Sequence, residues 1–164
     1  MHGNRDFLIG SGFARETGIA LLDDPHKVDL DGTPALLMHG DTLCTDDREY
    51  QAFRAQVRGP AWRNATLAKP LAERLAFGRE LRGGSEAAKQ GKAEVIMDVA
   101  PAAVERAFLD SGLDLLIHGH THRPARHVVN VAGRERMRWV LADWYARGSY
   151  LEATPAGLHA MAFG

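Results

Sequence analysis

The sequence has very little cysteine and no long apolar run. Its single cysteine, Cys44, cannot form a disulfide within one chain, which excludes a small secreted scaffold stabilised by disulfides. No stretch approaches the roughly 18 consecutive apolar residues of a membrane span, and the charged start of the chain contains no signal-peptide core. These absences predict a soluble, cytoplasmic protein.

The chain also has almost no net charge. A value of −1 argues against a nucleic-acid partner, but the charges are unevenly distributed. The segment from Arg48 to Lys92 contains ten Lys and Arg residues against four Glu, which is +6 in a chain that is otherwise acidic. This basic segment is either a solvated face or a contact for phosphate or lipid headgroups.

The most informative stretch is the sequence HGHTHRP at residues 118–124, which follows the apolar run Leu113–Ile117. This order is typical of a buried strand that delivers side chains at its carboxyl end. His120 and His122 are two residues apart, so on extended backbone they point the same way, and His118 shares that direction. Converging neutral imidazoles predict a divalent-metal site. The alternative is that these histidines only cap the strand and bond to nearby backbone.

A second stretch repeats the same order of residues. The apolar run from Ala35 to Met38 ends at His39, which is followed by Gly40 and Asp41. Two strands that each deliver a histidine before or beside a glycine predict one shared site at the carboxyl ends of both strands.

The first third of the chain predicts a turn, a helix and short strands. Gly3 to Asp6 suits a tight turn that leads into a helix ending near Gly18. Strands are expected at Ile19–Leu22, His26–Asp31 and Pro34–Met38, with Asp31-Gly32 as a hairpin turn.

The remainder predicts a helical insertion followed by strands, within one domain spanning residues 1–164. The insertion, at about 48–95, is expected to contain a helix capped by Thr45 or Asp46 with Tyr50, Phe53 and Val57 on its apolar face. Further helices should open at Pro60 and Pro70, and the latter should break at Gly83-Gly84-Ser85. A helix capped by Asp98 should run to about Ser111, with Val104 and Phe108 pointing inward and Gly112 ending it. Strands are expected after it at Arg126–Val131, Met137–Ala142, Ser149–Ala153 and Leu158–Phe163.

Several longer strings resemble a known family. They are HGNRDFLIG, LLMHGDTLCTDDREYQAFR, IMD and IHGHTHRPA, and the resemblance around them extends over nearly the whole chain. The chain is similar to the calcineurin-like metallophosphoesterases, and in particular to the branch that acts on UDP-2,3-diacylglucosamine in lipid A synthesis. The resemblance implies an α/β fold, a two-sheet sandwich flanked by helices, with a helical cap over the lipid chains and two Mn²⁺ ions.

The resemblance also implies a reaction and a location. The reaction is hydrolysis of the pyrophosphate bond to UMP and 2,3-diacylglucosamine 1-phosphate by a metal-activated water, at the cytoplasmic face of the inner membrane as a peripheral protein. No nucleic acid and no protein partner is expected. Two alternatives remain: another calcineurin-like phosphoesterase acting on nucleotides, or a non-catalytic metal-binding fragment.

Site residues follow from the same resemblance. The implied metal ligands are Asn4, His39, His120 and His122, and Asp41 is expected to support one of the imidazoles. Substrate contacts are implied for Asn4, Arg5, Asp47, Ser85, Lys89, Lys92 and His120, with Lys89 standing where a well-known member has Asn.

Arg5 stands where other members of the superfamily have a histidine, in the block Gly-Asn-His-Asp. Arginine stays protonated near pH 7, so it cannot donate a proton, but its planar fork can hold phosphoryl oxygens in the transition state. Arg5 is therefore the predicted catalytic residue. The alternative is that it pairs with Asp6 or with the start of the following helix.

Two family motifs, Asp-x-His and Gly-Asp, have no counterpart in this sequence. We therefore expect the chain to be truncated at the N-terminus, with strands missing and the di-metal site incomplete. In that case residues 1–164 alone should be inactive.

Overall fold

The computed structural model describes residues 1–89 and 96–164, and residues 85–89 by their backbone only. Its helices are α1 (Ser11–Thr17), the short 3-10 helix η1 (Asp41–Leu43), α2 (Arg48–Arg58), α3 (Pro60–Leu67), α4 (Leu71–Lys89) and α5 (Pro101–Ser111). Its strands are β1 (His26–Leu30), β2 (Thr33–Met38), β3 (Leu115–His118), β4 (Ala125–Val131), β5 (Arg134–Val140), β6 (Gly148–Thr154) and β7 (Gly157–Phe163).

Five strands form a mixed sheet in the order β1-β2-β3-β5-β4. The three central strands β2, β3 and β5 are parallel, whereas β1 and β4 are antiparallel to their neighbours. Because the central strands are parallel, their carboxyl ends meet at one edge of the sheet. The other two strands, β6 and β7, form a separate antiparallel hairpin.

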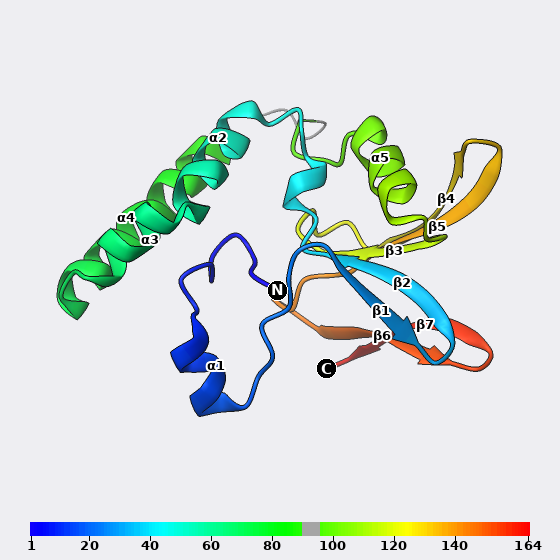
Figure 1. The fold of residues 1–164 in the computed structure, drawn as a ribbon, viewed down its shortest axis with the longest axis horizontal. Helices are drawn as coiled ribbons and strands as arrows, with labels where there is room; N and C mark the ends of the chain where they lie inside the picture. The colour runs from blue at the N-terminus through cyan, green and yellow to red at the C-terminus, as the bar shows by residue number, and fades with distance from the viewer. Residues whose placement is uncertain (90–95) are drawn as a thin grey trace.

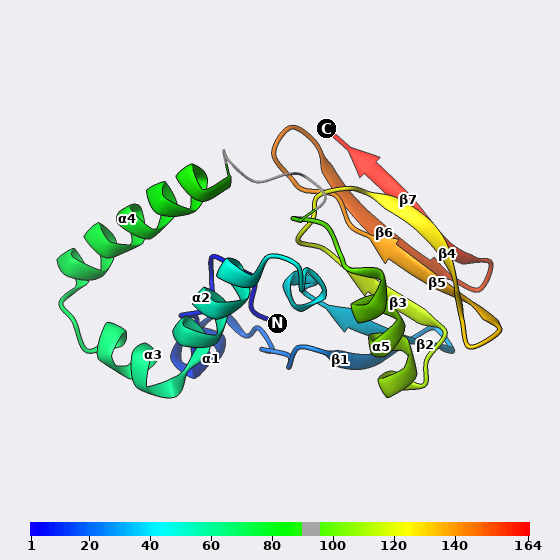
Figure 2. The ribbon, with the colours of Figure 1, turned by 90° about the horizontal axis from the view of Figure 1, so that it is seen from above.

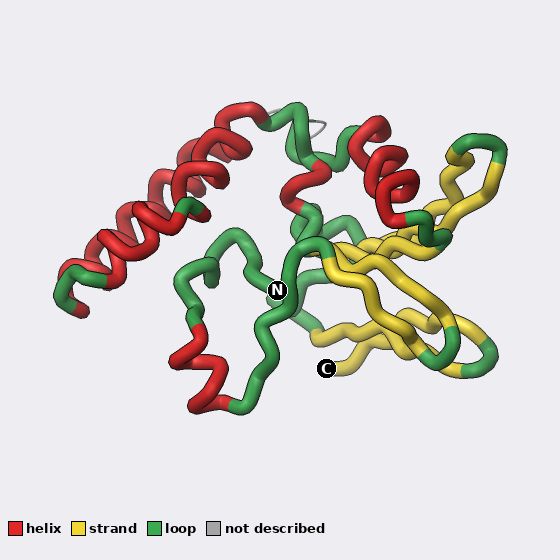
Figure 3. Tube along the Cα trace, viewed as in Figure 1, coloured by secondary structure: helices red, strands yellow, loops and turns green. Residues whose placement is uncertain are grey.

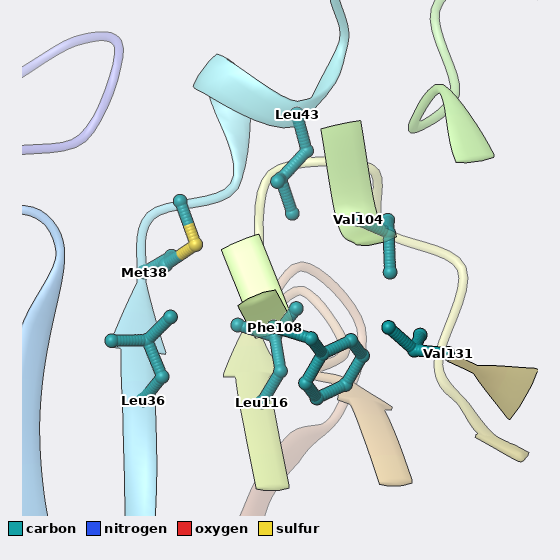
Figure 4. Close-up of a cluster of buried hydrophobic side chains, with 7 residues drawn as sticks. All are labelled: Leu36, Met38, Leu43, Val104, Phe108, Leu116 and Val131. Carbon is teal, nitrogen blue, oxygen red and sulfur yellow. The ribbon is translucent and has the colours of Figure 1, made fainter. Parts of the chain in front are cut away.

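Alternate residues of the central strands face two different cores. One core lies between the sheet and α5, and it includes Leu36, Leu116 and Phe108, all at most 4% exposed. Figure 4 shows these side chains pointing toward one another together with Met38, Leu43, Val104 and Val131. Val104 and Phe108 were both predicted to point inward from this helix, and both do.

The second core lies on the opposite face of the same strands. Ala35, Leu115 and Ile117 are buried there and pack against Leu151 and Leu158 of the β6–β7 hairpin. The large sheet therefore lies between α5 and the smaller sheet, as Figure 1 shows. The predicted α/β class, with two sheets flanked by helices, is confirmed.

The helices α2, α3 and α4 lie together on one side of the strands, where Figure 3 separates them from the yellow sheets. They fall within the predicted insertion. The predicted break at Gly83-Gly84-Ser85 is wrong, because α4 continues to Lys89. A glycine inside a helix costs only about 1 kcal/mol, which neighbouring helix-forming residues can offset.

The turns were predicted better than the helix starts. Asp31 and Gly32 have φ values of 52° and 84°, as the predicted two-residue hairpin turn between β1 and β2 requires. The predicted helix ends at Gly18 and Gly112 are also confirmed, since both adopt positive φ just after a helix.

Three local predictions are wrong. Residues 19–22 form no strand, and α1 begins at Ser11, well after the predicted turn. Asp98 does not cap α5, which begins at Pro101; its carboxylate accepts from Val99 N and pairs with Arg123 instead. An ion pair to another loop thus replaced the predicted cap.

Candidate functional site

The candidate site lies where β2 and β3 end side by side. Met38 pairs with His118 in register, and beyond them the amide of Gly119 donates to the carbonyl of His39 over 3.0 Å. The two histidine-bearing stretches thus form one edge of the sheet. The two stretches thus lie side by side as expected, and their role as one shared site stays a prediction.

His39 and His120 face one another at this edge. Their ring centroids are 5.0 Å apart in an edge-on arrangement. Burial lowers the pKa of His39, although the carboxylates of Asp41 and Asp24 act in the opposite direction. A neutral imidazole offers a lone pair, and Nε2 of His39 is buried with no hydrogen-bond partner among the described residues. This orphaned nitrogen beside a second imidazole fits a divalent cation.

The predicted extended backbone at His120 and His122 is wrong. β3 ends at His118, and both later histidines have positive φ, 69° and 54°, in the loop that follows. The ring of His122 is directed elsewhere: its Nδ1 lies 3.4 Å from a carboxylate oxygen of Asp143, and its ring lies 5.9 Å from that of Tyr145. In the described part of the chain, no three His, Cys, Asp or Glu side chains form a group that could hold a metal.

His118 has a structural role. It is fully buried, and its Nδ1 donates to the carbonyl of Gly119, which leaves Nε2 to accept from the guanidinium of Arg138 at 2.9 Å. Burial lowers the pKa of His118 to about 4, so the ring stays neutral near pH 7. Arg138 was not predicted from the sequence, although a charged residue on the inward face of a strand is itself an unusual signal.

Asp41 connects the sheet edge to α2. Its fully buried carboxylate accepts from the hydroxyl of Tyr50 and from Nε of Arg54, each over 2.8 Å. Burial alone would raise the pKa of Asp41, but the Tyr50 hydrogen bond, His39 and Arg54 together lower it. The predicted support of an imidazole by Asp41 is not among its hydrogen bonds, which go to α2.

These contacts also correct the predicted apolar face of α2. Val57 is buried as expected, but Tyr50 directs its hydroxyl to Asp41 and Phe53 is 36% exposed. The cap of the helix is Asp47, which accepts from Tyr50 N, in place of the predicted Thr45 or Asp46.

The loop that contains Asn4 and Arg5 lies against His39. A methyl group placed on Gly3 would come within 3.3 Å of Cε1 of the His39 ring. Asn4 is half-buried in this loop, whereas Arg5 is exposed. The structure therefore places Gly3, the residue before the predicted ligand Asn4, against the His39 ring, and it leaves Arg5 exposed.

The remaining predicted substrate contacts lie in the helical insertion. Asp47 caps α2, and Ser85 and Lys89 lie on the last turns of α4, where only the backbone is described. Lys92 lies outside the described residues. The substrate-binding roles of these four residues stay predictions.

Cys44 follows η1, three residues after Asp41, and is 1% exposed. Burial raises the pKa of its thiol to about 12, and the carboxylates of Asp98 and Asp41 add to that rise. Since the thiolate is the reactive form, we expect iodoacetamide to leave the native protein unmodified at pH 8 and to alkylate Cys44 once the chain is unfolded. Intact-mass spectrometry measures this, and rapid labelling of the folded protein would contradict the burial.

Known proteins match the chain over nearly its whole length. It is 53% identical to a UDP-2,3-diacylglucosamine hydrolase from Cellvibrio japonicus over 158 residues, which is 96% of this chain and 66% of that protein. It is 51% identical to the protein of that name from Xanthomonas campestris pv. campestris (strain B100), over 96% of this chain and 67% of the relative. The chain belongs to the UDP-2,3-diacylglucosamine hydrolase family.

A third family member, from Bordetella pertussis, is 56% identical over 142 residues, covering 87% of this chain and 55% of that protein. The chain thus spans about two thirds of the length of the first two relatives and little more than half of the third. No protein-family model matches the chain. Among the described residues, no helix is long and apolar enough to cross a membrane.

Proposed function

We propose that the chain contributes to hydrolysis of the pyrophosphate bond of UDP-2,3-diacylglucosamine, giving UMP and 2,3-diacylglucosamine 1-phosphate in lipid A biosynthesis. The observation that carries the proposal is family membership at about half identity over nearly the whole chain. The pair formed by His39 and His120 at the sheet edge supports it, because metal-assisted phosphoryl chemistry needs such ligands. No observation favours the alternative of a nucleotide-specific phosphoesterase.

We propose Mn²⁺ as the metal, which His39, His120 and Asn4 would hold in part. His122, whose ring lies beside Asp143 here, stays a predicted further ligand. When bound, two divalent ions lower the pKa of water and neutralise charge on phosphate oxygens. Burial lowers the pKa of His39, which favours the neutral imidazole that a metal needs, and Gly3, the residue before Asn4, lies against that ring.

Arg5 is the residue proposed to hold the phosphoryl oxygens during the reaction. Arg5→Lys should lower kcat at least about tenfold and leave Mn²⁺ affinity unchanged, because lysine keeps the charge but loses the bidentate fork. Steady-state kinetics and Mn²⁺ titration measure both. A variant that loses only metal affinity would contradict this role and would place Arg5 in the metal site.

The helical insertion is proposed to hold the acyl chains. Its exposed surface carries large apolar residues, among them Leu71 and Leu75, which are 62% and 54% exposed. Ser85→Ala and Lys92→Ala should raise KM for the diacyl substrate and spare bis-p-nitrophenyl phosphate, because remote contacts bind only substrates long enough to reach them. Equal losses on both substrates would make these residues structural.

The basic charge of the same insertion supports a peripheral location on the cytoplasmic face of the inner membrane. Each Lys or Arg residue close to an anionic membrane surface contributes about 1 kcal/mol of binding free energy. Co-sedimentation with vesicles containing about 30% anionic lipid, weakened by salt, should follow. Absence of binding at low salt would exclude this location.

The reaction itself is tested in an extended chain, which we define as residues 1–164 joined at the N-terminus to a segment that carries the family's Asp-x-His and Gly-Asp motifs. We propose that a few imidazoles and an amide are too few ligands for two dications, so residues 1–164 alone should release no UMP. The extended chain should release it with Mn²⁺.

Oxygen-18 water locates the bond that breaks. Water is proposed to attack the phosphorus on the uridine side, so its oxygen joins UMP, and the bridging oxygen leaves with the sugar 1-phosphate. The label should therefore appear in UMP. Label in the sugar phosphate would overturn the proposed direction of attack, and absence of UMP release from the extended chain would overturn the function.

A further inference from the structure

The loop formed by residues 2–9 packs its buried Phe7 ring 6.0 Å from that of Trp62 in α3, but it makes few hydrogen bonds to other described elements. Its hydrogen bonds are mostly internal: Gly3 N donates to the Asp6 carboxylate, Ile9 N donates to the Asp6 carbonyl, and the His2 ring contacts the Ile9 carbonyl at 2.7 Å. These bonds give the loop its shape but do not fix its position. In both Figure 1 and Figure 2 the N-terminus lies between α2 and the strand ends.

Arg58, at the end of α2, attaches the loop to this helix by hydrogen bonds. Its Nη2 donates to the carbonyl of Gly3 over 2.9 Å and lies 3.4 Å from that of His2. Its guanidinium also lies 5.5 Å from the centre of the Phe7 ring, which is itself buried. Among the described residues, Arg58 makes all the hydrogen bonds between this loop and other elements.

The guanidinium of Arg58 is held in place from the other side. It lies 3.7 Å from the buried carboxylate of Asp41, which also accepts from Arg54 on the preceding turn of α2. The Arg58 side chain is only 19% exposed, so these charges interact in a partly desolvated place. The buried Asp41 carboxylate therefore holds the Arg58 guanidinium, and Arg58 in turn holds the loop.

We infer that Arg58 is a positioning residue that aligns Asn4 and Arg5 with His39. This role requires no contact between Arg58 and the substrate. It acts through the Gly3 carbonyl, one residue before Asn4, while Gly3 itself lies against the His39 ring. The expected effect of Arg58 on turnover rests on the proposed function, whereas its effect on the loop does not.

The first test measures the loop directly in the chain of residues 1–164. Hydrogen exchange of the segment 2–9 should become at least about tenfold faster in Arg58→Met, because a hydrogen bond from a charged donor is lost. The exchange rate in Arg58→Lys should lie between the rates in Arg58→Met and in the parent chain. The matched control is Arg48→Met, an exposed arginine on the same helix, which should leave exchange unchanged. Unchanged exchange in both Arg58 variants would overturn the inference.

The second test is kinetic and uses the extended chain. Arg58→Met should lower kcat at least about tenfold with KM nearly unchanged, and combining it with Arg5→Lys should be no worse than the slower single variant. Fully additive losses would overturn positioning through Arg5. If exchange responds as expected but no variant or parent releases UMP, the proposed function fails while the attachment of the loop by Arg58 stands.

Discussion

His120→Ala should abolish Mn²⁺-dependent UMP release by the extended chain. Mutating a residue that only hydrogen-bonds to a metal ligand typically lowers activity about 10–100-fold. Removing a ligand itself should cost more, so we expect a loss of turnover above about 100-fold. The ring faces His39 at a centroid distance of 5.0 Å, so its removal leaves His39 without the neighbouring imidazole. Turnover and Mn²⁺ titration of the same preparation measure the effect.

The matched control is His159→Ala, which removes an exposed histidine on β7. It should change neither turnover nor metal affinity. His120 already has a positive φ of 69°, so the alanine variant inherits that strain and its melting temperature must be recorded alongside. A folded His120→Ala protein with normal turnover would remove the metal role from this residue.

The sheet was predictable because its signals are local. The strands β2 and β3 each contain a short apolar run, and the hairpin between β1 and β2 has Asp31-Gly32, which suits positive φ. The histidine at the end of β2 and those after β3 were found in the same way, since parallel strands bring their carboxyl ends together. Side-chain direction beyond the strand end was not predictable, which is why the directions of His120 and His122 were wrong.

The network around Asp41 could not be predicted for a different reason. Tyr50 and Arg54 have helical spacing, but spacing alone does not say that their polar ends meet one buried carboxylate. Tyr50 was consequently assigned to an apolar face. Contacts between elements far apart in the chain, such as Arg58 to Gly3, leave no periodic pattern in the sequence.

Gly40→Ala should be among the most destabilising single-methyl additions to this chain. Gly40 has a φ of 106°, and a Cβ atom there would lie 2.7 Å from Nδ1 of His118 and 2.9 Å from the carbonyl oxygen of Gly119. Backbone strain costs about 1–2 kcal/mol, and crowding of a packed site adds about 1–3 kcal/mol. His118 cannot move aside easily because both of its ring nitrogens are hydrogen-bonded.

Gly18→Ala separates the cost of backbone strain from the cost of crowding. Gly18 also has positive φ, at 73°, but no atom lies within 4 Å of the position that a methyl group would take there, so only the strain remains. Urea unfolding should show Gly40→Ala losing about 1–3 kcal/mol more free energy of unfolding than Gly18→Ala. Equal losses would mean that the His118 ring and the Gly119 carbonyl relax at little cost. The edge that holds His39 and His120 would then be far more deformable than its hydrogen bonds indicate.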